Sequence, residues 1–258
     1  MTRLLFILLA LLTALPVRSG AATNDFCTTG VAEFNAAHRD WDGPRFGAAV
    51  ELFRRATTNA PANSTNFYWL GVAQFHRMLH LEHSAGSKTN KAVIEAMREA
   101  ALEALTAAAK LNDADAESHA LLGTLYGMKI EGGFFRALRF GPSVASHQER
   151  ALKHGADNPR VQYLYGMCQF HTAKKTAEWQ TALQTLLKAG KLFEAEAKTT
   201  AAPLAPRWGY DSCLTFLGRT YELLGQRKEA EDYFRKALAM HPADHLAKEG
   251  LKRVTEEK

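Results

Sequence analysis

The sequence predicts an all-α protein, a right-handed solenoid of about ten or eleven helices stacked as antiparallel pairs. Three observations support this prediction. Short segments that carry a glycine among large apolar residues recur along the chain, and each is followed by a second amphipathic segment. No alternating pattern of the kind typical of strands interrupts them. The final segment, residues 243–256, is rich in charged residues, like the polar cap that stacked repeats need at their end.

The first 22 residues have the layout of an export signal. Arg3 gives a positive start, Leu4–Leu15 is an apolar run, and Pro16–Ala22 is a small-residue exit. The apolar run is shorter than the roughly 20 residues that span a bilayer. This favours a cleaved signal peptide over residues 1–22, with a retained membrane anchor as the alternative. We therefore expect an exported protein, periplasmic or secreted, with no stable membrane anchor after cleavage.

The net charge argues against one class of function, and the cysteine content argues against disulfide bonds as the main support of the fold. Removing two arginines and no acid with residues 1–22 lowers the formal net charge from +5 to +3, and no long basic run is present. Nucleic-acid binding is therefore not expected, because it usually needs a clustered basic face. The three cysteines, Cys27, Cys168 and Cys213, form no disulfide framework, so the fold must be held by packing.

The clearest repeat runs from residue 211 to residue 244. Small residues stand where two antiparallel helices would cross closely, and aromatic residues fill the space beside that pair. A proline follows the second helix and stops it. The residues of this pattern are Leu217, Gly218, Tyr221, Ala230, Phe234, Ala237 and Pro242.

Looser copies precede this repeat, with Gly71, Gly123 and Gly166 in register with Gly218. The 34-residue pattern resembles the tetratricopeptide repeat, and the resemblance covers residues 28–244. It implies a solenoid with a concave protein-binding face, and it supplies no catalytic residues or cofactor. The arrangement as a whole is similar to a group of exported bacterial repeat proteins without an assigned biochemical role.

The repeat domain is expected over residues 23–258, with inserts near 76–90, 130–142 and 199–208. Each pair buries its apolar sides only by stacking on its neighbours, so a single array is expected. The expected helices cover residues 28–41, 45–59, 63–83, 89–111, 115–129, 143–154, 159–172, 177–198, 209–224, 227–240 and 243–256.

Histidines at positions 76, 80 and 83 share one side of an expected helix. His76 and His80 are weak candidates for a metal pair, because catalytic zinc usually needs three protein ligands. Arg77 also stands where the zinc-protease pattern requires glutamate. We interpret these histidines as the solvated edge of a groove, and no metal or cofactor is expected.

The leading functional hypothesis is a non-enzymatic exported scaffold that binds protein or peptide segments along the concave face. Aromatic and methionine side chains suit such contacts because they offer large apolar area. The same residue types are also typical of an ordinary core. The candidate groove residues are Phe34, His38, Trp41, Tyr68, Phe75, His76, Tyr163, Met167, Phe170, His171 and Arg219.

Two questions stay open from the sequence. The insert at residues 131–142 carries three phenylalanines among two arginines, and it either plugs the solenoid or contacts a partner or membrane. An alternative function is a small-molecule or metal-binding accessory of an envelope transporter. The sequence offers no nucleophile with a matching base and acid, so an enzyme is not expected.

Overall fold

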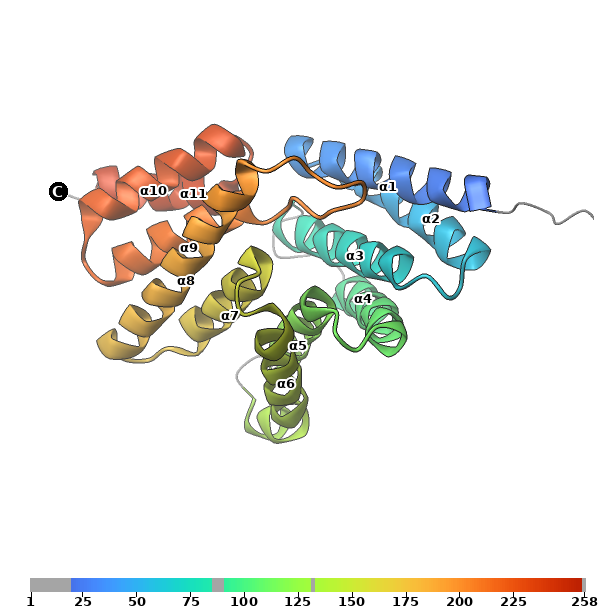
Figure 1. The fold of residues 1–258 in the computed structure, drawn as a ribbon. Coiled ribbons are helices and arrows are strands. Elements are labelled where there is room, and N and C mark those ends of the chain that lie inside the picture. Colours follow the sequence, from blue (N-terminus) through green and yellow to red (C-terminus); the bar gives the residue numbers. More distant parts are fainter. Residues whose placement is uncertain (1–19, 85–90, 131–132, 257–258) are drawn as a thin grey trace, which may run out of the picture.

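A computed structural model describes residues 20–84, 91–130 and 133–256, in which eleven helices and no strands are found (Figure 1). The helices are α1 (Gly20–Asp40), α2 (Gly43–Asn59), α3 (Ser64–Ser84), α4 (Lys91–Leu111), α5 (Ala116–Ile130), α6 (Phe134–Gly155), α7 (Pro159–Thr172), α8 (Thr176–Ala197), α9 (Tyr210–Leu223), α10 (Arg227–Met240) and α11 (His245–Glu256). The predicted all-α solenoid is confirmed. Most of the predicted signal peptide and part of the 76–90 insert lie outside the described residues.

Nine of the eleven helices begin and end within two residues of the predicted bounds, while α1 and α6 begin earlier. For α6 the sequence predicts a start at residue 143, because Gly141–Pro142 is a typical helix-start signal. The helix instead begins at Phe134 and contains Pro142. The proline removes the hydrogen bond to the carbonyl of Leu138, but Leu138 is exposed, so water can satisfy that oxygen. Of the two alternatives for residues 131–142, the described part does not plug the solenoid, because it extends α6 outward with Phe134, Phe135 and Leu138 exposed.

Close helix crossing explains the recurring glycines. In four pairs a glycine of the first helix lies against a large side chain of the second. A Cβ atom there would come within 2.4 to 2.9 Å of that side chain. The contacts are Gly30 with Phe53, Gly71 with Leu105, Gly166 with Leu186, and Gly218 with Phe234. The α5–α6 pair is looser, since a Cβ at Gly123 would lie 3.4 Å from Gln148.

The last repeat is packed around Phe234, which lies between Gly218 of α9 and Gly250 of α11. Ala230 and Ala237 are fully buried beside it. The other predicted packing residues of this repeat take three different roles. Leu217 is buried in the core, Tyr221 is half-buried and stacks on Tyr233, and Pro242 is exposed just after α10.

The helix pairs follow a curve that brings the C-terminal pair back beside the end of α1 (Figure 1). Residues 199–209, called the crossing segment below, leave α8 and extend across to α1 and α3 before α9 begins. The interior of the curve is therefore occupied by the chain itself. Within the described ranges, none of the helices combines the length and apolar character needed to cross a membrane.

Candidate functional site

The crossing segment lies on the concave side of the solenoid and is held by two residues of α3. The indole N–H of Trp69 donates to the carbonyl of Leu204, over 3.0 Å. The indole N–H of Trp208 donates to the hydroxyl of Tyr68, over 3.1 Å. Arg207 donates to the carbonyl of Glu196 at the end of α8. The concave face thus holds a non-helical segment by aromatic contacts and hydrogen bonds.

The segment turns at Leu204, which has a φ of 63°, and the amide of Ala205 bonds back to the carbonyl of Ala202 at 3.0 Å. A φ in this region is uncommon for a residue with a side chain. The turn is therefore kept by its surroundings, and the bond from Trp69 is one of the contacts that hold it.

A buried ion network lies beneath Trp208 and joins four helices. Arg160 of α7 donates from Nε to Glu117 of α5 at 2.8 Å. Its two terminal nitrogens donate to the carboxylate of Glu196 in α8, at 2.6 and 3.0 Å. Glu117 also accepts from Asn158 at 2.7 Å and from the hydroxyl of Tyr68. Charges buried in this way are costly unless each is paired and hydrogen-bonded, as these are.

In this network Arg160 stays positively charged and Tyr68 stays neutral. Burial opposes the charge on Arg160, but the hydrogen bond to Glu196 and the charge of Glu117 outweigh it and raise the arginine's pKa. Burial raises the pKa of Tyr68 well above its ordinary value, and the negative charge of Glu117 adds to this. Tyr68 therefore stays a neutral donor to Glu117, and the network positions residues without moving protons at neutral pH.

A second cluster joins the two ends of the solenoid. Nδ1 of His241, just after α10, donates to Oδ2 of Asp211 at 3.1 Å. His38 of α1 stacks on His241, with ring centroids 5.5 Å apart. His76 of α3 lies edge-on to His38 at 5.3 Å and to Trp208 at 5.2 Å. These residues, with Trp41, are called the histidine cluster below.

Burial decides the charge of this cluster. Burial, with a smaller contribution from the nearby His38, lowers the pKa of His76 to about 3. Burial also lowers the pKa of His38, although Asp211 opposes the shift. Burial disfavours the carboxylate of Asp211, but His38 and the hydrogen bond from His241 outweigh it and lower the pKa to about 2. At neutral pH His38 and His76 are therefore neutral beside one carboxylate.

The predicted open groove is wrong for most of its candidate residues. The curvature of the array and the crossing segment remove their side chains from solvent. Phe34, Tyr68, Phe75, His76, Tyr163 and Phe170 are buried, and His38, Trp41 and Met167 are partly buried.

His171 is the exposed member of the predicted groove, at the end of α7, and Arg219 is partly buried. The guanidinium of Arg219 lies over the rings of Phe170 and Phe216, at 4.9 and 5.0 Å. These residues cover an aromatic core and do not line an open channel.

The weak metal candidates do not come together. The Nδ1–H of His76 donates to the carbonyl of Val72, while His80 lies beside Trp41. His83 faces His245 instead, with ring centroids 4.6 Å apart. In the part of the chain that the structure describes, no group of three His, Cys, Asp or Glu residues is placed to hold a metal ion.

The three cysteines are free thiols. Burial raises the pKa of Cys27 to about 11 and also raises the pKa of Cys168. Reactive cysteines usually have a lowered pKa in a positively charged setting. The sulfur of Cys168 instead accepts a hydrogen bond from Gln148 at 2.9 Å, a packing role.

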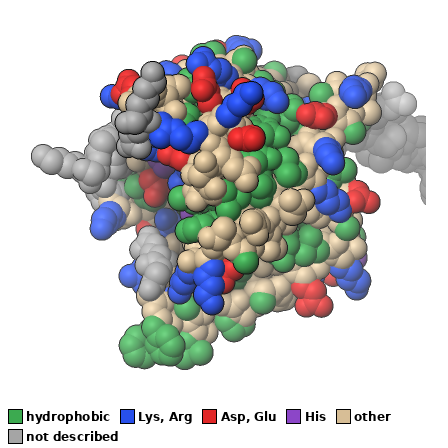
Figure 2. Space-filling model, turned by 90° about the vertical axis from the view of Figure 1, so that its left-hand side faces the viewer, with side chains coloured by type: hydrophobic (Ala, Val, Ile, Leu, Met, Phe, Trp, Pro, Cys, Tyr) green, Lys and Arg blue, Asp and Glu red, His purple; other side chains and the backbone are tan. Residues whose placement is uncertain are grey.

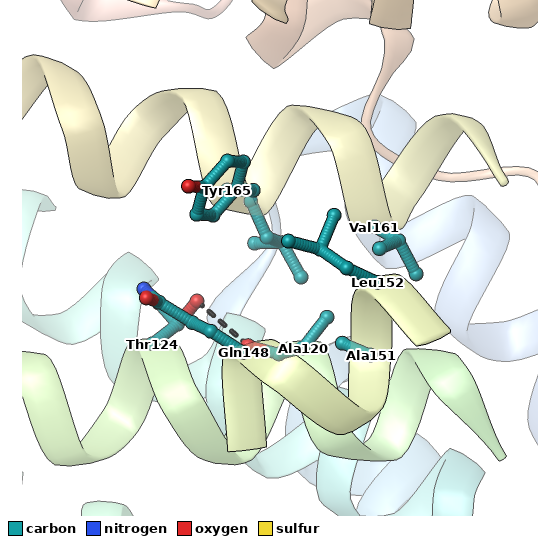
Figure 3. Close-up of a pocket in the computed structure, with 8 residues that line it drawn as sticks. Ala120, Thr124, Gln148, Ala151, Leu152, Val161 and Tyr165 are labelled. Atoms are coloured by element: carbon teal, nitrogen blue, oxygen red, sulfur yellow. Dashed lines mark hydrogen bonds between the residues drawn. The ribbon is translucent and has the colours of Figure 1, made fainter. Parts of the chain in front are cut away.

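A small hollow lies between α5, α6 and α7 (Figure 3). Its volume is about 10 Å³, and Thr124, Gln148 and Tyr165 are among the residues around it. The hydroxyl of Thr124 is already bonded to the carbonyl of Ala120 at 3.0 Å. Because a cavity of this size holds about one water molecule, the hollow is not a site for an organic ligand.

Sequence reasoning missed the polar residues that organise the concave side. Glu117 and Arg160 of the ion network lie far apart in the sequence, and so do Asp211 and His241 of the histidine cluster. One signal was present: Glu117, Arg160 and Asp211 each occupy the first turn of a first-of-pair helix. Such positions converge when the pairs stack on a curve.

Comparisons with known proteins agree with this fold. A family model described as "Regulator of microtubule dynamics protein 1-3" matches residues 42–257. No curated protein gives a significant match. Similar solved structures include TTC0263, a thermophilic TPR protein of Thermus thermophilus. It has 16% identity and a TM-score of 0.63, and the match covers 91% of this chain and all of that one. The APC/C hetero-tetramer Cut9–Hcn1 has 14% identity and a TM-score of 0.50, over 92% of this chain and 46% of that one.

Proposed function

The chain belongs to the family of regulator of microtubule dynamics proteins 1–3, and from this premise we propose that it is a non-enzymatic scaffold. In this proposal it binds an extended segment of a protein partner on its concave face. The observation that carries the proposal is the crossing segment itself. The concave face already binds a non-helical stretch of about ten residues, which is the form of ligand that we propose.

The contacts of the crossing segment define the chemistry of the ligand. Trp69 binds a backbone carbonyl, so this contact accepts any side chain. Trp208 is buried against Tyr68 and His76, so this position selects a large aromatic residue. Arg207 reaches the end of α8, where the carbonyl of Glu196 accepts from it. A competing partner segment would carry an aliphatic residue, then a basic and an aromatic residue about three positions later, as Leu204, Arg207 and Trp208 do.

The first residues of the crossing segment are held less firmly than the last ones, so a partner segment could displace it beginning at the exposed end. Residues 199–203 are exposed, whereas Trp208 and Gly209 are buried. A partner would replace the turn at Leu204 first, since that turn is held at its tip by one bond from Trp69 and has an uncommon φ.

We also propose that the protein is exported, and this part of the proposal is supported only by the predicted signal peptide at residues 1–22. Recovery of protein without residues 1–22 from outside the cytoplasm would support export, and full-length protein in the cytoplasm would contradict it. The family's description concerns microtubule dynamics, so tubulin is one candidate for the protein partner. The small-molecule or metal alternative has no supporting observation among the described residues.

The binding test uses a labelled peptide with the sequence of residues 198–209 as its probe. In one variant, residues 200–202 become a protease recognition site, so that cutting separates the crossing segment from α8 while Leu204, Arg207 and Trp208 are retained. In a second variant, Leu204→Val weakens the turn, because a β-branched side chain disfavours the φ of 63° at this position. We expect the peptide to bind both released forms about tenfold more tightly than intact protein, because an attached segment competes at a high effective concentration.

A peptide with the same composition in scrambled order serves as the control. Thermal unfolding must show that each released form is folded. If folded, released protein binds the two peptides equally, or binds the native peptide no better than intact protein does, the proposed function is wrong.

A further inference from the structure

The start of α6 exposes the most accessible large apolar side chains of the described chain. Phe134 is 77% exposed, Phe135 is 82% exposed and Leu138 is 70% exposed. The next most exposed, Met240, reaches only 50%. Residues 134–139 are called the α6 tip below. Figure 2 shows a hydrophobic projection at the lower edge of the molecule, the end where Figure 1 places the α5–α6 pair.

The α6 tip is amphipathic in a specific way. At about 100° per residue, Phe134, Phe135 and Leu138 fall within an arc of about 100°. Arg139 and Arg136 follow at about 140° and 200°, so two cations border the apolar side. From Phe134 to Gln148, α6 contains no acidic residue.

The tip is held away from the core. Phe140 turns back onto Tyr126 of α5, with ring centroids 6.3 Å apart. The ammonium of Lys129 lies 5.2 Å from the same ring. This contact anchors the first turns of α6 to α5, while the three apolar side chains of the tip stay exposed. The apolar side is therefore presented by ordered helix.

We propose that the α6 tip inserts into the surface of a membrane that contains anionic phospholipid. Aromatic and leucine side chains on one side of a helix enter the headgroup region, and the cations beside them attract anionic lipid. The patch is small for a protein partner. The two phenylalanines offer about 300–500 Å², and the leucine adds less than a third phenylalanine would, so the tip falls short of the about 800 Å² per partner in a stable protein interface. The proposal does not depend on the concave face or on its ligand.

The test is flotation of the full chain with vesicles of phosphatidylcholine, alone or mixed with phosphatidylserine. The tip variant carries Phe134→Ser, Phe135→Ser and Leu138→Ser. The matched control variant carries Leu111→Ser, Leu223→Ser and Met240→Ser, which are also exposed. We expect wild type and the control to float with the mixed vesicles, and the tip variant to lose about tenfold or more in binding.

Charge is tested separately with Arg136→Gln and Arg139→Gln. This double variant is expected to lose the preference for phosphatidylserine, and wild-type binding should weaken as salt is added. In Phe135→Trp, the added indole emission should shift to the blue on mixed vesicles.

Three outcomes would overturn the proposal. One is a wild-type chain that does not float. Another is a tip variant that floats as well as wild type, because binding then comes from elsewhere, such as the apolar run at residues 4–15. The third is self-association in sedimentation velocity that the tip substitutions abolish while vesicle binding is absent, which would assign the tip to a second copy of the chain.

Discussion

His38 of the first helix lies against Asp211 of the ninth, with 3.9 Å between Nε2 and Oδ2. His241 donates to the same carboxylate oxygen. The two ends of the solenoid therefore meet at one buried carboxylate. Stacked repeats normally contact only their neighbours, so this closure adds a long-range contact, and it makes stability sensitive to protonation.

Acid should weaken the folded protein through His76. Its pKa is about 3 in the folded chain because of burial, against an ordinary value of 6.5. Below pH 6.5 the unfolded chain binds a proton that the folded chain does not. The free energy of unfolding should therefore fall by about 1.4 kcal/mol per pH unit for this histidine. In His76→Phe, the free energy of unfolding should fall less steeply with decreasing pH, by about 1.4 kcal/mol per pH unit between pH 6 and 4.5. Denaturant unfolding at several pH values measures this dependence.

The matched control for this slope is His154→Gln, at an exposed position near the end of α6. Below about pH 4 a second loss is expected as Asp211, with a pKa lowered to about 2, begins to be protonated in the unfolded chain first. An unchanged slope in His76→Phe would show that His76 is not the group that titrates.

Replacing glycine by alanine should have opposite effects at a crowded helix crossing and at an open position in a helix. A Cβ at Gly71 would lie 2.4 Å from Cγ of Leu105, so Gly71→Ala must displace a core side chain. We expect a loss of about 1–3 kcal/mol in the free energy of unfolding. Gly127 is also inside a helix but has no neighbouring atom within 4 Å. Gly127→Ala should stabilise by about 0.5–1 kcal/mol. Equal effects in the two variants would contradict the close crossing.

The buried ion network predicts a large cost for losing its cation. Arg160→Met leaves Glu117 and Glu196 without their shared partner. Breaking a buried pair in this way typically costs about 3–5 kcal/mol. Arg235→Met breaks an exposed pair with Glu231 in α10 and should cost only about 0.3–0.5 kcal/mol. Chemical denaturation of both variants measures the difference, and a cost below about 1 kcal/mol for Arg160→Met would mean that water enters the network.

The helices were predictable because each carries its own signals. Proline at the start of α7, glycine at recurring crossings and apolar periodicity are local, so the sequence shows them directly. Pro142 misled the prediction of α6, because a proline inside a helix is tolerated when the freed carbonyl reaches water. The sequence pattern does not reveal that exposure.

The concave side was harder to predict because it depends on curvature. Phe34 and Tyr163 were assigned to a groove by their offsets within the repeat, and both are buried. Whether that side is open depends on how far the array bends and on the path of residues 199–209. Neither quantity is encoded in a single repeat, so the same residues that would bind a partner in an open array are core here.

Phenylalanine truncation distinguishes these two interpretations of the inward side. Phe34 is fully buried, and its ring centroid lies 5.4 Å from that of Trp69 and 5.0 Å from that of His76. Phe34→Ala should lower the free energy of unfolding by about 3–5 kcal/mol, because it removes apolar contacts and leaves a cavity. Phe134→Ala, at the exposed α6 tip, should change it by less than about 0.5 kcal/mol. An open groove would make the two costs similar, whereas a closed interior separates them by several kcal/mol in the same denaturant titration.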